Sequence, residues 1–110
     1  MNINDYQKEA MTLLNPALTG KDVLMNALMG LCGESGEAID IMKKHLYQGH
    51  ELDREKLIKE LGDIAWYLAE TAYALEVPLS RVLEENIEKL RKRYPEGFDS
   101  MKSIHRSEAE

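Results

Sequence analysis

Apolar residues recur at steps of three and four positions in two long stretches of the chain. This spacing places them on one face of an α-helix. The first stripe contains Leu24, Leu28, Leu31, Ala38 and Met42, and the second contains Leu57, Leu61, Ile64, Leu68, Ala72 and Leu75. No segment alternates with period two over a useful length, so we expect no strand. The sequence therefore predicts an all-α fold.

The three prolines mark where helices begin or end. Proline lacks a backbone N–H and is tolerated at helix boundaries rather than inside helices. Pro16, Pro78 and Pro95, together with Gly49, divide the chain into four predicted helices, over about residues 5–14, 22–47, 53–75 and 79–94. Asp53 is a good N-cap for the third helix. The residues from 99 to 110 are polar and charged, so we expect a single four-helix domain over residues 1–98 and a mobile tail.

Composition limits the classes of function. The 110 residues, 44% apolar and 31% charged, fit one soluble globular domain. A net charge of −6 argues against coating a nucleic-acid polymer. The apolar runs are too short for a membrane span, and the N-terminus does not resemble a signal peptide. Cys32 is the single cysteine, which fits a cytoplasmic protein without an internal disulfide.

Two acidic pairs lie beside these stripes, Glu34-x-x-Glu37 and Glu60-x-x-Asp63. Residues three apart on a helix are neighbours on its surface. If the two helices pack antiparallel, four carboxylates converge, and a hard divalent cation such as Mg²⁺ is the usual way to hold them. The pattern suggests handling of a phosphate-bearing substrate. The competing interpretation is a solvated helix face, whose acids are balanced by Lys43, Lys44, Lys56 and Lys59.

Four glycines lie inside the predicted helices, where each costs roughly 0.5–1 kcal/mol relative to alanine. Gly33 and Gly36 adjoin Glu34 and Glu37, which suggests close approach of another backbone, a side chain or a ligand. Gly30 and Gly62 suggest tight helix packing.

A second strip on the third helix combines small and aromatic residues: Gly62, Trp66, Ala69 and Tyr73. A helix that is apolar on two sides needs burial on two sides. Four short helices are unlikely to provide this, so we expect a homo-oligomer that buries Trp66 between subunits.

The end of the fourth helix carries a polar and basic face. It comprises Asn86, Lys89, Arg93 and Tyr94, at steps of mostly three or four. Such a face could steer phosphates and stack on a base or ribose, or it could be an ordinary solvated surface. The three histidines show no ligand spacing and are expected at the surface, which favours a hard cation over iron. Cys32 is expected to be a small packing residue.

The combination LMGLCGESGEAID…KELGDIAWYLA…NIEKLRKRYPEGF resembles the MazG-type all-α nucleoside triphosphate pyrophosphohydrolases, over roughly residues 6–98. Glu34 and Glu37 match the second and third acids of the family motif, and Glu60 and Asp63 match its later pair. Gly33 stands where the motif has its first acid, which leaves the number of metals open.

The resemblance implies hydrolysis of a nucleoside triphosphate to the monophosphate and pyrophosphate, for nucleotide-pool housecleaning. It implies Mg²⁺ (or Mn²⁺) held by Glu34, Glu37, Glu60 and Asp63, and an active site completed in a homo-oligomer, either dimer or tetramer. Substrate phosphates would contact the segment that carries Asn86, Lys89, Arg93 and Tyr94, and the nucleotide would touch Tyr6 and Gln7. The alternative is a non-catalytic, metal-binding helical interaction module. Base and sugar preference, and the phosphorus attacked, stay open.

Overall fold

The computed structural model describes residues 1–106, which are helical apart from the connections between helices. The helices are α1 (Ile3–Met11), α2 (Lys21–Tyr47), α3 (Arg54–Ala74), α4 (Leu79–Arg93) and α5 (Ser100–Ile104). The first four agree with the predicted helices, so the all-α fold is confirmed. The fifth lies in residues 99–110, which were expected to form a mobile tail, so that expectation was wrong for Ser100–Ile104, and residues 107–110 lie outside the described part. The chain divides into two compact units, Met1–Leu79 and the residues from Ser80 onward, and each is described by itself.

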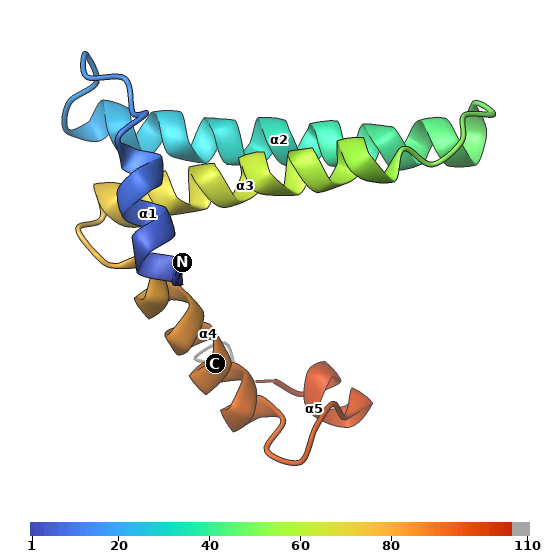
Figure 1. The fold of residues 1–110 in the computed structure, drawn as a ribbon. Coiled ribbons are helices and arrows are strands. Elements are labelled where there is room, and N and C mark those ends of the chain that lie inside the picture. Colours follow the sequence, from blue (N-terminus) through green and yellow to red (C-terminus); the bar gives the residue numbers. More distant parts are fainter. Residues whose placement is uncertain (107–110) are drawn as a thin grey trace. The chain divides into compact units, whose positions relative to one another are not determined.

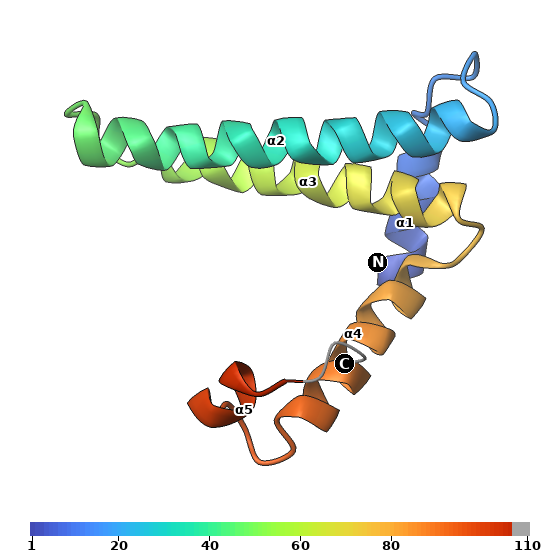
Figure 2. The same ribbon diagram turned by 180° about the vertical axis from the view of Figure 1, so that it is seen from behind.

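The first unit is built on a hairpin of two long antiparallel helices, α2 and α3, which lie side by side in both views (Figures 1 and 2). Gly49, with φ of +75°, lets the chain turn after α2. The carboxylate of Asp53 then accepts the backbone N–H of Lys56 at 3.0 Å and caps α3, as the sequence predicted. The hairpin sets residues of α2 opposite residues of α3 along its whole length.

Helix α1 crosses α3 near the end of the hairpin that carries the start of α2 (Figure 1). The Asn2 side chain caps it by accepting the N–H of Asp5 at 2.8 Å. The indole N–H of Trp66 donates to the carbonyl of Ala10 at 3.1 Å. Trp66 is therefore in contact with α1 of the same chain, whereas Tyr73 in the same strip is 51% exposed. Trp66 stays half-buried in the single chain, and its burial between subunits stays a prediction.

Small side chains make most of the buried core. The fully or nearly buried apolar residues are Ala10, Val23, Ala27, Ile41, Ala69, Ala72 and Leu79. Three members of the predicted stripes, Leu28, Leu61 and Leu75, are 44%, 55% and 56% exposed instead. Helices that meet through alanine and glycine approach closely, so the larger leucines fall beside the contact rather than in it. The stripes predicted the helices correctly but not which residues are buried.

The second unit contains α4 and α5. After α4 the chain reverses through a tight turn, in which the N–H of Gly97, at φ of +96°, donates to the carbonyl of Tyr94 at 3.1 Å. An isolated bridge joins Pro95 and Gly97. The Asp99 side chain then caps α5 by accepting the N–H of Met101 at 2.8 Å. Within the described residues, no helix is long and apolar enough to cross a membrane.

Candidate metal centre

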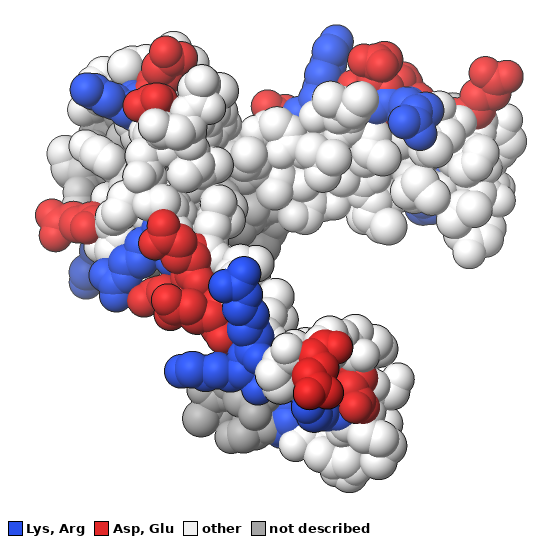
Figure 3. All heavy atoms as spheres, turned by 60° about the horizontal axis from the view of Figure 1, so that its bottom comes forward, with Lys and Arg blue, Asp and Glu red and all other residues white. Residues whose placement is uncertain are grey.

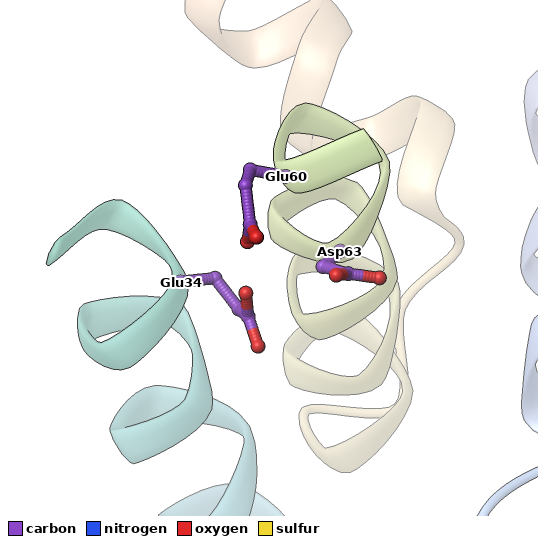
Figure 4. Close-up of side chains that lie close together, drawn as sticks. All are labelled: Glu34, Glu60 and Asp63. Atoms are coloured by element: carbon purple, nitrogen blue, oxygen red, sulfur yellow. The ribbon is translucent and has the colours of Figure 1, made fainter. Parts of the chain in front are cut away.

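Three of the four predicted acids meet between α2 and α3. Glu34 extends from α2, and Glu60 and Asp63 extend from α3 (Figure 4). One carboxylate oxygen from each lies within 4.8 Å of the others. Glu34 and Glu60 are half-buried, whereas Asp63 is exposed. The antiparallel pairing predicted from the sequence brings Glu34 to Glu60 and Asp63.

The proximity of these acids changes their acidity. A hydrogen bond to Glu60, followed by partial burial and by the charges of Glu60, Asp63 and Glu37, raises the pKa of Glu34 from 4.5 to about 7. The protonated carboxyl is favoured because carboxylates held this close repel one another when all are ionised. In the absence of a cation, Glu34 therefore keeps its proton to a higher pH than an isolated glutamate does.

One oxygen in the cluster has no partner. The Oε2 atom of Glu60 is buried and accepts no hydrogen bond from any described residue. Buried carboxylate oxygens are normally satisfied, and an exception calls for an explanation such as an ion. Three hard oxygen donors, an excess of negative charge and an unsatisfied buried oxygen fit a divalent cation of the Mg²⁺ type.

Glu37 lies one turn beyond Glu34 on α2 and is exposed. It is not among the three residues whose oxygens converge, although its charge contributes to the raised pKa of Glu34. Its role as a fourth ligand stays a prediction.

Two residues that the sequence reasoning missed extend the polar seam between α2 and α3. Glu70 is fully buried, and both of its oxygens accept from the Nδ2 of Asn26 at 3.0 Å. Glu70 lies seven residues, about two turns, after Asp63 and so on the same side of α3. That spacing was the available signal. Between this pair and the acids, the ring of Tyr67 lies against Gly30 and fills the space of a side chain there.

The predictions for the four helical glycines have different outcomes. Tight packing at Gly30 is confirmed. At Gly62 it is wrong, because a Cβ there would meet no described atom within 4 Å. Gly33 and Gly36 are also open, so the approach of a partner or ligand at these two stays a prediction.

Helix α1 contributes the two N-terminal residues named in the sequence analysis. Partial burial and the negative charge of Asp63 raise the pKa of Tyr6, so Tyr6 lies within electrostatic range of the cluster. Gln7 has a different task. Its Nε2 donates to the carbonyls of Ala69 and Val77 at 3.3 and 3.2 Å, and its Oε1 accepts the N–H of Leu79 at 2.9 Å. Gln7 thus holds α1 to the end of α3 and the turn after it, and its contact with a nucleotide stays a prediction.

The predicted substrate-binding residues lie in the second unit. Asn86 and Lys89 are exposed on α4, and Arg93 and Tyr94 are half-buried at its end. The Arg93 guanidinium lies 5.8 Å from the centre of the Tyr94 ring, which in turn lies 5.4 Å from the ring of Phe98. Their approach to the carboxylates stays a prediction.

Cysteine and histidine play no part in the carboxylate cluster. Cys32 is exposed, so its predicted role as a packing residue was wrong. The three histidines are exposed, as expected. The Nδ1 of His45 lies 2.9 Å from the carbonyl oxygen of His50, beside the turn that follows α2.

Comparison with known proteins points to one family. The MazG nucleotide pyrophosphohydrolase domain matches residues 23–98, which is more than half of the chain and includes all four predicted acids. Gene 37 protein of Mycobacterium phage L5 is 41% identical over 73 residues, which cover 63% of this chain and 64% of the phage protein. The chain thus spans somewhat less than two thirds of that relative. No solved structure matches this chain. The chain belongs to the MazG nucleotide pyrophosphohydrolase domain family.

Proposed function

We propose that this protein hydrolyses a nucleoside triphosphate, ribo- or deoxyribo-, to the nucleoside monophosphate and pyrophosphate, as a housecleaning enzyme of the nucleotide pool. The observation that carries the proposal is the convergence of Glu34, Glu60 and Asp63 within the segment that matches the family. One oxygen of Glu60 is buried there without a hydrogen-bond partner among the described residues. The net charge of −6 favours a free nucleotide over a nucleic-acid polymer as the ligand. A cytoplasmic location, drawn from the single cysteine, stays a prediction.

Glu34, Glu60 and Asp63, with Glu37 beside them, would hold Mg²⁺, or Mn²⁺ in its place. Such an ion joins carboxylate to phosphate oxygens and acidifies a bound water. Glu34, which reaches into the cluster from α2, would orient the attacking water or accept its proton.

The basic face of α4 would act on the leaving group. Lys89 and Arg93 would stabilise the negative charge that develops on pyrophosphate. Asn86 would add a neutral hydrogen-bonding group, and Tyr94 would stack on the base or ribose. These roles require the second unit to approach a carboxylate cluster, in the same chain or in another copy.

We infer that the active form is a homo-oligomer, because the hairpin exposes large apolar side chains. Met25 and Ile39 on α2 are 60% and 66% exposed, and Ile58 on α3 is 55% exposed. Large apolar side chains exposed in number on one hairpin favour a partner that covers them. Sedimentation equilibrium at micromolar concentration would show a dimer or tetramer, and a monomer would contradict the inference.

The test is pyrophosphate release from a panel of canonical and modified nucleoside triphosphates, with Mg²⁺ and with EDTA. Release that requires Mg²⁺ is expected, and the ranking of substrates would identify the preferred base and sugar. Binding of Mg²⁺ without turnover of any nucleotide would favour the alternative, a non-catalytic metal-binding module.

A further inference from the structure

The segment from the end of α4 to α5 is basic, although the chain as a whole is acidic. Residues 89–106 contain six lysines and arginines and one histidine, against two acids, Glu96 and Asp99. The complete chain has a net charge of −6. Figure 3 shows acidic and basic side chains interspersed on the visible face, with no broad basic surface there. A site for an anion must therefore come from the local arrangement of these basic residues.

The turn after α4 folds this charge around a shallow pocket. The chain turns at Gly97, and the end of α4 and residues of α5 border a common space. Between them lies a cavity of about 470 Å³. Its charged and titratable lining consists of Lys92, Arg93, Asp99, Lys102, His105 and Arg106. Four permanent cations and a histidine thus border a space large enough for a small anion.

The single acid in the lining is partly compensated by the backbone. The Oδ1 of Asp99 accepts the N–H of Met101 at 2.8 Å and that of Lys102 at 3.4 Å. These hydrogen bonds hold the Asp99 carboxylate against the start of α5 and reduce its effect on the pocket. Among the described residues that line the pocket, positive charges therefore outnumber negative ones.

We propose that this pocket binds a phosphate-bearing anion. Arginine offers a planar pair of donors that matches phosphate oxygens, and lysine adds a point charge. Lys102, His105 and Arg106 lie beyond residues 23–98, so they are outside the segment that matches the family. The proposal concerns the second unit alone and does not depend on hydrolysis by the first.

The test is calorimetric titration with inorganic pyrophosphate in EDTA, where no divalent ion is present to attach pyrophosphate to the carboxylates. The double variant Lys102→Gln/Arg106→Gln removes two cations and leaves Arg93 unchanged. The control, Lys21→Gln/Arg54→Gln, removes one lysine and one arginine from exposed positions in the first unit. Circular dichroism checks that helicity is retained in both.

The wild type and the control should bind pyrophosphate alike, and the pocket variant should bind about tenfold or more weakly, since each charge-assisted hydrogen bond is a large contribution. The affinity should also fall as salt is raised. Absence of pyrophosphate binding to the wild type, or equal binding by the pocket variant, would overturn the proposal.

Kinetics separate the two sources of such an anion. If the pocket takes the phosphates of a nucleotide, the pocket variant should raise the KM for the nucleoside triphosphate with little change in kcat. If it takes free phosphate or pyrophosphate, KM should be unchanged while the pyrophosphate affinity falls. Should no nucleotide be hydrolysed at all, the titration in EDTA still decides the proposal.

Discussion

At the scale of single residues, the carboxylate cluster is held in a state that its own charges oppose. The neighbouring acids raise the pKa of Glu34, Asp63 lies close by, and the Oε2 of Glu60 is buried without a partner among the described residues. Acids arranged in this way cost stability in the absence of a cation, and such a cost is common where side chains are placed for function.

Removing one negative charge from the cluster should abolish turnover. Asp63→Asn keeps the size of the side chain but loses a charged ligand, and we expect activity to fall more than about a hundredfold, since even outer-shell partners of metal ligands cost tenfold to a hundredfold. Glu37→Gln should do the same if Glu37 is the fourth ligand. Pyrophosphate release measures the loss, and Asp22→Asn at the exposed start of α2 is the control. Full activity of either variant would remove that residue from the metal site.

The raised pKa of Glu34 predicts a dependence of stability on pH. Without metal, the folded protein keeps a proton on Glu34 up to about pH 7, whereas the unfolded chain releases it near pH 4.5. The folded state therefore binds more protons in this window, so the free energy of unfolding should fall as pH rises from 4.5 to 7. The pKa of Asp40 is lowered by Lys44 and Lys43, so its own effect lies below this window.

Urea unfolding in EDTA at several pH values measures this slope. Glu34→Gln cannot ionise and should lose most of the slope, whereas Glu51→Gln, a change at an exposed acid in the loop before α3, should keep it. An identical slope in the wild type and in Glu34→Gln would show that Glu34 does not hold the proton.

The contact between Gly30 and Tyr67 predicts a packing defect. A Cβ at Gly30 would collide with the Tyr67 ring, so Gly30→Ala should destabilise the protein by about 1–3 kcal/mol, the usual cost of overpacking. Gly62→Ala meets open space and gains helix propensity, so it should be neutral or stabilising by up to about 1 kcal/mol. Thermal unfolding compares the two. Equal stability of both variants would show that the Tyr67 ring moves away without cost.

At the scale of the helices, α1 is attached to α3 through a few specific polar contacts. Trp66 binds the end of α1 through the Ala10 carbonyl, and Gln7 bridges α1 to Ala69, Val77 and Leu79. This attachment brings Tyr6 within range of Asp63. The position of α1 is thus part of how the cluster is arranged.

Gln7→Glu should loosen this attachment. The two side chains have nearly the same shape, and glutamate can still accept from the Leu79 N–H. It cannot donate to the Ala69 and Val77 carbonyls and would place a charge beside them. We expect a loss of about 2 kcal/mol or more in the free energy of unfolding, because partly buried groups lose their partners. Gln48→Glu, after α2, is the exposed control, and an equal effect of the two changes would contradict this role.

Amphipathic spacing and proline positions were sufficient to predict the first four helices, because both are local signals in the sequence. It was not sufficient for Trp66 and Gln7, whose partners lie 56 to 72 residues away in the sequence. The acid pairs could be matched because both lie on long helices of one hairpin. Glu70 was missed because a single acid among apolar residues gives no sign that Asn26 will meet it. Helix α5 was missed because its capping by Asp99 depends on the preceding turn.

At the scale of the whole molecule, the proposed chemistry needs both units. The carboxylates belong to the first unit and the basic face of α4 to the second. The exposed apolar surface of the hairpin also favours assembly with another copy. If a neighbouring copy supplies the basic face, the active site would be complete only in the assembled protein.

Arg93→Ala tests whether the two units cooperate. If the guanidinium stabilises the departing pyrophosphate, kcat/KM should fall about tenfold to a hundredfold, the value of one charge-assisted hydrogen bond. Arg93→Lys should recover only part of this loss, because lysine cannot form the same paired contact. Arg91→Ala, two residues away on another side of α4, should change kcat/KM little, and circular dichroism should show equal helicity in all three. If Arg93→Ala and Arg91→Ala have equal kcat/KM, the basic face plays no part in the reaction, and the carboxylate cluster of the first unit must act without it.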